Sequence, residues 1–496
     1  MYWLDALSAV LTIEPLLAIA IGVPIGMIFG AIPGLSATMA VALCLPLTFT
    51  MAPVTALVLL LALYIGGVSG GLVSAIMIGI PGTPSSIATT FDGRPMALKG
   101  EGGRALGLAI FYSFVGGLFG IAVLILLAPP LARFALKFGT FEYFSVSVFA
   151  LTLVAGLAGK SLLKGVLAAL LGILIAATGF APTDGIPRFT FGNPQFDAGY
   201  ALLPVLLGMF AVNEILDYAA RPPESRVSPP AEFTRPRFPG VRMVEFIASL
   251  PNVVRSAAIG IGVGLLPGIG SSASNLLAYA AARSSSKEPE SFGTGNPAGI
   301  VSSETANNAN VGSAMVPLMA LGIPGDSVTA MLLGGLMIHG LQPGPLLFTN
   351  NGLIVHALFV ALLIANLAML LVAFFGIRFF VRILAVPKPY LLALVMVTCV
   401  IGAYATGNRM FDVYTLLAFG GLGLLLTRLG FPLPPFILGF ILGPLIEVNL
   451  RSALMSSRGS FVPFLERPFS AMFLGLAAAY IVLVMVRKVR LMRRAA

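Results

Sequence analysis

The chain has 496 residues, of which 58% are hydrophobic and 10% are charged, and its mean hydropathy is +1.00. Soluble domains carry about 25% charged residues, so this composition places the chain in a lipid bilayer. It excludes a nucleic-acid-binding domain, a secreted disulfide scaffold and a disordered protein. The net charge of +10 fits basic cytoplasmic loops rather than a nucleic-acid partner.

Continuous apolar runs predict an all-α polytopic membrane protein with about twelve transmembrane helices, plus re-entrant or broken half-helices. A first series of runs lies at about 7–30, 36–80, 105–128, 143–158, 161–180 and 200–217. A second series lies at about 243–265, 297–320, 352–375, 388–404, 412–428, 432–447 and 468–486. The 56 glycines and 36 prolines favour helices that are interrupted and closely packed.

A stretch rich in proline and arginine divides the chain into two halves. Residues 1–218 are a predicted membrane repeat 1, and 219–242 are a cytoplasmic linker. Residues 243–450 are membrane repeat 2, and 451–496 are a final transmembrane helix with a basic cytoplasmic tail. No lysine or arginine precedes Arg94, which predicts a periplasmic N-terminus.

The two halves share their interruptions. The segment Gly30–Gly34 (GAIPG) recurs as Gly264–Gly268 (GLLPG), and Gly79–Gly82 (GIPG) recurs as Gly322–Gly325. Two matched Pro-Gly breaks, in the same order and at nearly the same spacing, predict an internal duplication.

Parity gives the orientation of the repeats. The linker and the C-terminus both have cytoplasmic charge, so an even number of spans separates them. The final helix lies outside the repeat, so each repeat holds an odd number of spans. Two odd repeats in tandem are inverted structural repeats, which are typical of secondary transporters.

Small polar residues follow each Pro-Gly break. This pattern predicts an unwound segment that leads into a half-helix, whose free amides and partial positive charge suit a carboxylate. The alternative is four packed helix kinks. The candidate substrate-binding residues at the breaks are Pro33, Gly34, Ser36, Thr38, Pro81, Gly82, Thr83, Ser85, Pro267, Gly268, Ser271, Ser272, Pro324 and Gly325.

The run 302–310 (SSETANNAN) is the most polar part of any predicted span. A helix that starts near Ala298 would place Asn307 and Asn308 about 15 Å along its axis, near the middle of the bilayer. Their amide N–H groups could hold a substrate carboxylate. The alternatives are a polar contact between helices and a helix start at the membrane interface.

Three further side chains offer hard oxygen ligands for a Na⁺ site, namely Glu304, Asn310 and Asp326. Acidic residues inside a membrane are expensive and usually functional. A capped or solvated carboxylate is the alternative for Glu304, and an N-cap is the alternative for Asp326.

The remaining polar features predict no chemistry. The charged residues of 92–104 are expected to form a surface loop, and His339 is expected to be a packed histidine. Cys44 and Cys399 lie in apolar runs, and no zinc-protease motif, P-loop or cysteine cluster is present, so no enzyme is predicted. From the residues, three classes remain open: a transporter, a channel or a membrane-embedded enzyme.

Taken in order, Gly30 to Thr38, Ile78 to Met96, Glu304 to Asn308 and Leu321 to Gly325 resemble the large membrane subunit of the tripartite tricarboxylate transporters, the TctA family. The resemblance covers nearly the whole chain. It implies a permease of the bacterial inner membrane that imports organic di- or tricarboxylates such as citrate, by symport with Na⁺ or H⁺. It also implies a small membrane subunit and a periplasmic substrate-binding protein as partners.

Overall fold

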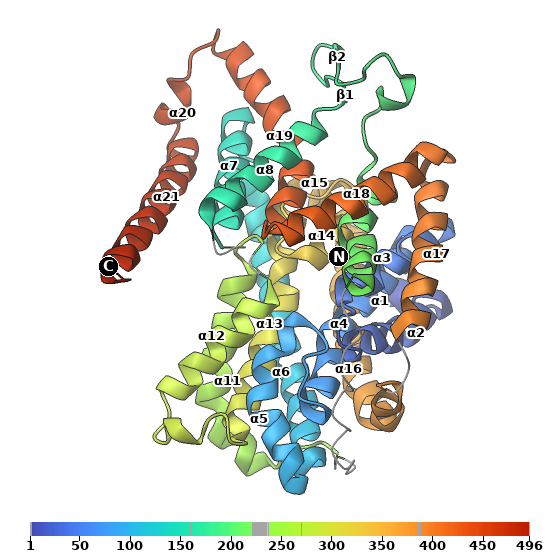
Figure 1. Cartoon of the computed structure of the whole chain (residues 1–496), viewed down its shortest axis with the longest axis vertical. Helices are drawn as coiled ribbons and strands as arrows, with labels where there is room; N and C mark the ends of the chain where they lie inside the picture. Colours follow the sequence, from blue (N-terminus) through green and yellow to red (C-terminus); the bar gives the residue numbers. More distant parts are fainter. Residues whose placement is uncertain are drawn as a thin grey trace. The chain divides into compact units, whose positions relative to one another are not determined.

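The computed structural model describes residues 2–157, 161–220, 236, 238–268, 270–384 and 388–495, and these are almost entirely helical (Figure 1). Within them, strand structure is limited to β1 (Gly179–Phe180), which pairs antiparallel with β2 (Pro187–Arg188). Ten of the described helical stretches are long and apolar enough to cross a membrane. These observations confirm an all-α polytopic membrane protein, while the count of about twelve spans stays a prediction.

Residues 221–235 and 237 of the predicted linker lie outside the described residues. The helices before the linker are α1 (Tyr2–Val10), α2 (Ile13–Ala31), α3 (Ala37–Cys44), α4 (Pro53–Met77), α5 (Ile87–Met96), α6 (Gly102–Ala135), α7 (Thr140–Leu157), α8 (Leu162–Ala176), α9 (Leu202–Leu207) and α10 (Asn213–Ala219). Short helical turns include η1 (Pro46–Thr50), η2 (Pro84–Ser86), η3 (Ala97–Glu101) and η5 (Gly208–Val212).

A similar succession follows the linker. Its helices are α11 (Met243–Gly264), α12 (Ser271–Ser284), α13 (Pro297–Leu321), α14 (Ser327–Ile338), α15 (Pro345–Asn350), α16 (Gly352–Ile383), α17 (Lys388–Gly407), α18 (Met410–Arg428), α19 (Leu433–Ser456), α20 (Pro463–Glu466) and α21 (Pro468–Ala495). In both halves a helix, a Pro-Gly break and a shorter helix precede a buried helix of 25 residues, which are α4 and α13. A second Pro-Gly break then leads into α5 or α14.

Proline and glycine set the element boundaries. The predicted run 36–80 is divided into α3, η1 and α4, because Pro46 and Pro53 lack the amide hydrogens that one continuous helix needs. Helix α13 begins after Asn296, whose side chain accepts a hydrogen bond from the Ala298 amide, and it ends at Gly322 in the left-handed conformation.

The chain forms two compact units, and each combines segments of both halves. The first comprises Met1–Ala132, Glu214–Leu265 and Ile269–Gly402. The second comprises Arg133–Asn213, Leu266–Gly268 and Ala403–Ala496, and in it α19 packs on α7 and α8 while α21 packs on α7.

Helices α4 and α13 are the central pair of the first unit. Both are buried around their whole circumference over most of their length, as expected of helices without a charged outer face. Helix α4 is covered by α2, α3 and α16, and α13 is covered by α11 and α12.

The short helices after the second breaks are exchanged between the halves. Helix α5 of the first half packs on α12 and α13 of the second, and these segments lie side by side in Figure 1, in blue and yellow-green. Helix α14 of the second half packs on α3 and α4 of the first. This reciprocal packing is the arrangement that a duplicated, symmetry-related pair of repeats would produce.

Candidate functional site

The polar run of α13 is buried inside the first unit. The side chains of Glu304, Asn307 and Asn310 have no exposed surface, and that of Asn308 is 2% exposed. Buried polar groups usually have hydrogen-bond partners, so the partners of each side chain show whether it has a structural role or retains free hydrogen-bonding capacity.

The Glu304 carboxylate is held by two hydroxyl groups. Thr89 Oγ1, on α5, donates to Oε1 at 2.5 Å, and Ser113 Oγ, on α6, donates to Oε2 at 2.9 Å. Thr89 also lies 3.1 Å from Ser303 Oγ. Among the described residues no cationic side chain pairs with Glu304. The carboxylate is therefore neither solvated nor a helix cap.

Asn308 joins the two central helices. Its Oδ1 accepts a hydrogen bond from Ser69 Oγ of α4 at 2.7 Å, and its Nδ2 donates to Glu304 O at 3.1 Å. Beside it lies an enclosed cavity of about 10 Å³, into which the amide of Asn366 also faces. The volume is at the lower limit for one water molecule. For Asn308, the alternative of a polar contact between helices is thus observed, because its side chain bonds α13 to α4.

Asn307 and Asn310 retain unused hydrogen-bonding capacity. Neither polar atom of the Asn307 amide has a well-aligned hydrogen-bond partner within the described part of the chain, although the amide lies close enough to Glu304 to interact with its carboxylate as a loose hydrogen-bond donor. Asn310 Nδ2 donates to Gly260 O at 3.3 Å, but its Oδ1 has no partner, and neither does Thr305 Oγ1. Unpaired buried groups cost about 1–3 kcal/mol each, which natural sequences retain mainly where a ligand or water uses them.

The breaks have matched backbone conformations in the two halves. Gly34 and Gly268 have φ of 86° and 75°, and Gly79 and Gly322 both have φ of 74°. In the second pair of breaks the left-handed residue is thus the glycine before the Ile-Pro-Gly sequence. Gly82 is needed for a different reason: a Cβ atom there would lie 2.0 Å from Gly30 O. This contact brings the two breaks of the first half together.

The helices that start after the breaks differ in their caps. Ser36 caps α3 by accepting from the Met39 amide at 3.2 Å. Asp326 caps α14 by accepting from the Thr329 amide at 2.8 Å, so the N-cap alternative is observed. Its second oxygen accepts from Tyr64 OH of α4 at 2.6 Å.

The remaining two helices are α5, whose first turn is capped by a residue of the opposite half, and α12, which has no side-chain cap among the described residues. The Ala88 amide in the first turn of α5 donates to Asn275 Oδ1 of α12 at 2.7 Å. The first turn of α12 itself has Gly270 at the N-cap and no side-chain cap in the described residues. Ser271 and Ser272 in this turn are half-buried. Of the four helices that start after a Pro-Gly break, α12 is therefore the one whose first-turn amides have no side-chain acceptor among the described residues.

The open end of α12 lies close to other predicted site residues. Ser274 Oγ approaches Ala306 O of α13 at 3.4 Å, next to Asn307. The Cβ atom of Asp326 lies 3.8 Å from where a Cβ atom of Gly270 would be. Helix α12 also packs on η2, which follows the Pro81-Gly82 break. Parts of three predicted motifs thus surround the α12 start.

The remaining predicted residues are placed as follows. Thr38 is buried in α3, Pro33 and Gly34 are partly or fully exposed, and Thr83 Oγ1 lies 2.8 Å from Ser85 Oγ. Pro324 and Gly325 are buried. Pro267 and Gly268 belong to the second unit, where Gly268 contacts Val154. Glu304, Asn310 and Asp326 share no hydrogen-bond partner among the described residues.

Sequence reasoning missed five residues that complete the cluster. They are Tyr64, Ser69, Thr89, Ser113 and Asn366. Four of them lie in apolar helices and Thr89 lies in the polar α5, and only the tertiary partner of each distinguishes it from a packed hydroxyl or amide.

The expected surface loop at 92–104 is wrong in its conformation and for Asp92, whereas Lys99, Glu101 and Arg104 are exposed as expected. The segment is helical through α5, η3 and the start of α6, and Asp92 has no exposed surface. Its carboxylate accepts from the amides of Gly293, Gly295 and Asn296 at 2.7–2.8 Å. Tyr279 OH donates to it at 2.9 Å. These four donors replace water, which explains how the charge is buried. The side chain of His339 is half-buried, 3.2 Å from Thr48 Oγ1.

Residues 16–438 match the family described as "Tripartite tricarboxylate transporter TctA family". The chain is 35% identical over 446 residues, 88% of its length, to an Agrobacterium vitis protein described as "Uncharacterized 52.8 kDa protein in TAR-I ttuC' 3'region", of which 86% is covered. A second protein of that organism, "Uncharacterized protein in TAR-II ttuC' 3'region", is 34% identical over 228 residues, 46% of this chain and 94% of that protein. No solved structure matches.

Proposed function

The chain belongs to the tripartite tricarboxylate transporter TctA family, and from this membership and the buried polar cluster we propose that it is the permease subunit of a secondary active importer of organic carboxylates. Di- and tricarboxylates are the proposed substrates. The observation that carries the proposal is the buried Asn307 amide of α13, whose Nδ2 has no well-aligned acceptor among the described residues, beside the start of α12, where no side-chain cap is found among them. Amide donors without partners and a helix N-terminus both favour a bound anion.

The repeat relation suggests where a carboxylate group binds. Tyr64 of α4 donates to Asp326 at the start of α14. At the matching positions of the other half stand Asn307 of α13 and Thr83 before η2, and the Asn307 amide has no well-aligned hydrogen-bond partner in the part of the chain that the structure describes. We expect a substrate carboxylate to accept hydrogen bonds from Asn307 Nδ2, the Thr83 hydroxyl and the first-turn amides of α12. Ser271 and Ser272 line the same end.

Glu304 is the proposed group for coupling to a cation gradient. An ionised carboxylate this deep, with hydroxyl donors and no cationic partner, costs several kcal/mol. Glu304 therefore carries a proton or shares its charge with a bound Na⁺, for which Asn308 and the hydroxyls of Thr89 and Ser113 supply hard oxygens nearby. Loss of either cation would favour a different arrangement of α5 and α6 around the carboxylate.

The proposed assembly follows from the family name. A periplasmic binding protein delivers the substrate, and a small membrane subunit completes the complex in the bacterial inner membrane. The linker and C-terminus are cytoplasmic, the N-terminus is periplasmic, and the repeats are inverted about an axis in the membrane plane. The reciprocal packing of α5 and α14 supports this symmetry.

Uptake of radiolabelled citrate tests the proposal in proteoliposomes that contain the chain with its two partner subunits. A symporter accumulates citrate above the external concentration when an inward Na⁺ or H⁺ gradient is imposed, and loses this accumulation when the gradient is collapsed. Equilibration without accumulation under either gradient would instead identify a channel. Competition by unlabelled succinate and citrate would then rank di- against tricarboxylates.

A further inference from the structure

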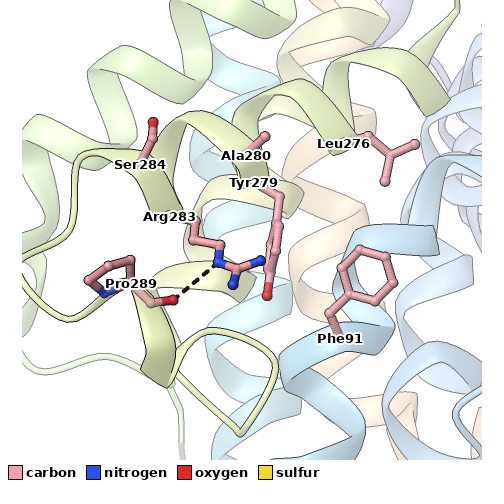
Figure 2. Close-up of a pocket in the computed structure, with 7 residues that line it drawn as sticks. All are labelled: Phe91, Leu276, Tyr279, Ala280, Arg283, Ser284 and Pro289. Carbon is pink, nitrogen blue, oxygen red and sulfur yellow. Dashed lines mark hydrogen bonds between the residues drawn. The ribbon is translucent and has the colours of Figure 1, made fainter. Parts of the chain in front are cut away.

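A second feature of the first unit lies apart from the polar cluster. A surface pocket of about 460 Å³ opens between α5 and α12, lined by Phe91, Leu276, Tyr279, Ala280, Arg283, Ser284 and Pro289 (Figure 2). The volume is in the range of small-molecule sites. None of these residues belongs to the site proposed for the carboxylate.

The pocket has an apolar end and a cationic end. Phe91 and Leu276 are 41% and 39% exposed, and the neighbouring Leu277 is 53% exposed. Arg283 and Ser284 lie at the opposite end, about two turns or 10 Å farther along α12. In Figure 2 the guanidinium of Arg283 and the ring of Phe91 lie on either side of the Tyr279 ring.

Arg283 has free donors. Its Nε donates to Pro289 O at 3.1 Å, and within the described residues no carboxylate pairs with the guanidinium. A guanidinium has five N–H donors in a planar fork that suits a phosphate. The Ser284 side chain is exposed and donates only to Ala281 O. The cationic end is thus complementary to an anionic headgroup.

The pocket wall is held in place before any ligand binds. Tyr279 OH donates to the buried Asp92, and Asp92 also accepts from three amides of the segment that joins α12 to α13. Lys99 Nζ, from the segment before α6, donates to Thr294 O at 2.7 Å. These contacts fix α5, α12 and the 285–296 segment relative to one another, so ligand binding would cost little ordering entropy.

We propose that this pocket binds an anionic phospholipid, with the phosphate on Arg283 and Ser284 and an acyl chain along Phe91, Leu276 and Leu277. The proposed orientation of the chain places the basic α12 end at the cytoplasmic surface, where anionic lipids occur. The polarity gradient of the pocket then has the same direction as that of a lipid. A soluble organic anion would leave the exposed leucines uncovered, which favours the lipid.

A bromolipid quenching experiment tests the proposal on the full chain. Trp3 is the one tryptophan of the sequence, so a Trp3→Phe, Phe91→Trp variant carries a single reporter at the pocket. It is reconstituted in phosphatidylcholine vesicles that contain either brominated phosphatidylglycerol or brominated phosphatidylcholine at equal mole fraction. We expect about five-fold preferential association of the anionic lipid, which corresponds to ~1 kcal/mol for one basic residue at the surface.

Three further variants make the result specific. Arg283→Gln should remove the preference, whereas Arg378→Gln, at an exposed arginine of α16 outside the pocket, should leave it intact. Ala280→Trp, made in a separate background and followed by native mass spectrometry, should fill the pocket and reduce retained phosphatidylglycerol with the charge unchanged. Equal quenching by the two lipids in the reporter variant would overturn the proposal. Displacement by free glycerol phosphate or citrate would also overturn it, by identifying a soluble-anion site. None of these measurements depends on transport, so they remain informative if the proposed function fails.

Discussion

Replacement of Asn307 by alanine should separate transport from stability. The side chain is fully buried and neither of its polar atoms has a well-aligned hydrogen-bond partner among the described residues. Removing it breaks no well-aligned hydrogen bond and loses only the loose contact of its amide with Glu304, so the free energy of unfolding should change by about 0.6 kcal/mol or less. If Asn307 Nδ2 donates to a substrate carboxylate, the lost charge-assisted bond is worth ~1.5–3 kcal/mol, and kcat/KM for uptake should fall about 10- to 150-fold.

Asn308→Ala provides a contrast on the same helix. It deprives Ser69 of its acceptor and Glu304 O of a donor, so it should lower stability by about 0.6–1.7 kcal/mol. Asn449→Ala is the matched control, because Asn449 is a half-buried asparagine of α19 whose amide donates only to Leu445 O in the same helix. This control should change neither quantity.

Both quantities can be measured on the same preparations. Uptake of radiolabelled citrate in proteoliposomes gives kcat/KM, and a maleimide dye that fluoresces on reaction with thiols gives the unfolding temperature. The dye suits this chain because Cys44 and Cys399 are both free and buried. Normal uptake by Asn307→Ala would refute the assignment of the site. A large drop in its unfolding temperature would refute the claim that its amide has no well-aligned partner.

Three other outcomes follow from the same structure. Cysteines introduced at Tyr2 and Ser225 should differ in reactivity toward an impermeant maleimide in intact cells, with Tyr2→Cys labelled and Ser225→Cys protected; equal labelling would contradict the inverted topology. Glu304→Gln should abolish the dependence of uptake on the cation gradient, because an amide neither exchanges a proton nor balances a bound Na⁺; a retained dependence, measured by citrate uptake at several gradients, would remove Glu304 from the coupling role. Gly82→Ala should prevent correct packing of α2 against α4 and lower the yield of folded protein, because the new Cβ atom would lie 2.0 Å from Gly30 O. Gly34→Ala should lower the free energy of unfolding by only about 1–2 kcal/mol, because Gly34 has a φ of 86° but lies at an exposed position. Size-exclusion chromatography gives the yield of folded protein for both variants, and comparable yields would contradict the packing argument.

Much of the fold could be predicted because membrane helices leave a strong signal in the sequence. Long apolar runs locate the spans, and Pro-Gly pairs locate the points where the helices stop. The start of α13 at Pro297 lies one residue from the predicted Ala298. The subdivision of 36–80 was not predicted as such, although Pro46 and Pro53 carry the signal for it.

The tertiary partners of the polar residues could not be predicted. Ser113 is one hydroxyl in an apolar stretch and Thr89 is one of two adjacent threonines, and only the packing of α5 and α6 against α13 brings them to Glu304. The burial of Asp92 could not be predicted for the same reason. Charged residues near one another usually indicate solvent, and nothing local reveals that three amides some two hundred residues later replace it.

The differences between the four helix starts bear on how the two halves of the predicted duplication would form a single directional site. Helices α3 and α14 are capped by their own Ser36 and Asp326, and α5 receives Asn275 from the opposite half. A helix start that is capped internally gains less from an anion, because the cap already accepts from one of its free amides. The start of α12 has no side-chain acceptor among the described residues, so we propose that an external carboxylate takes that place. The same asymmetry separates Tyr64, which donates to Asp326, from Asn307, which has no well-aligned hydrogen-bond partner among the described residues. Both helix starts of the first half are thus capped, whereas the second half combines the capped α14 with the open start of α12, which is where the proposed site has its free donors.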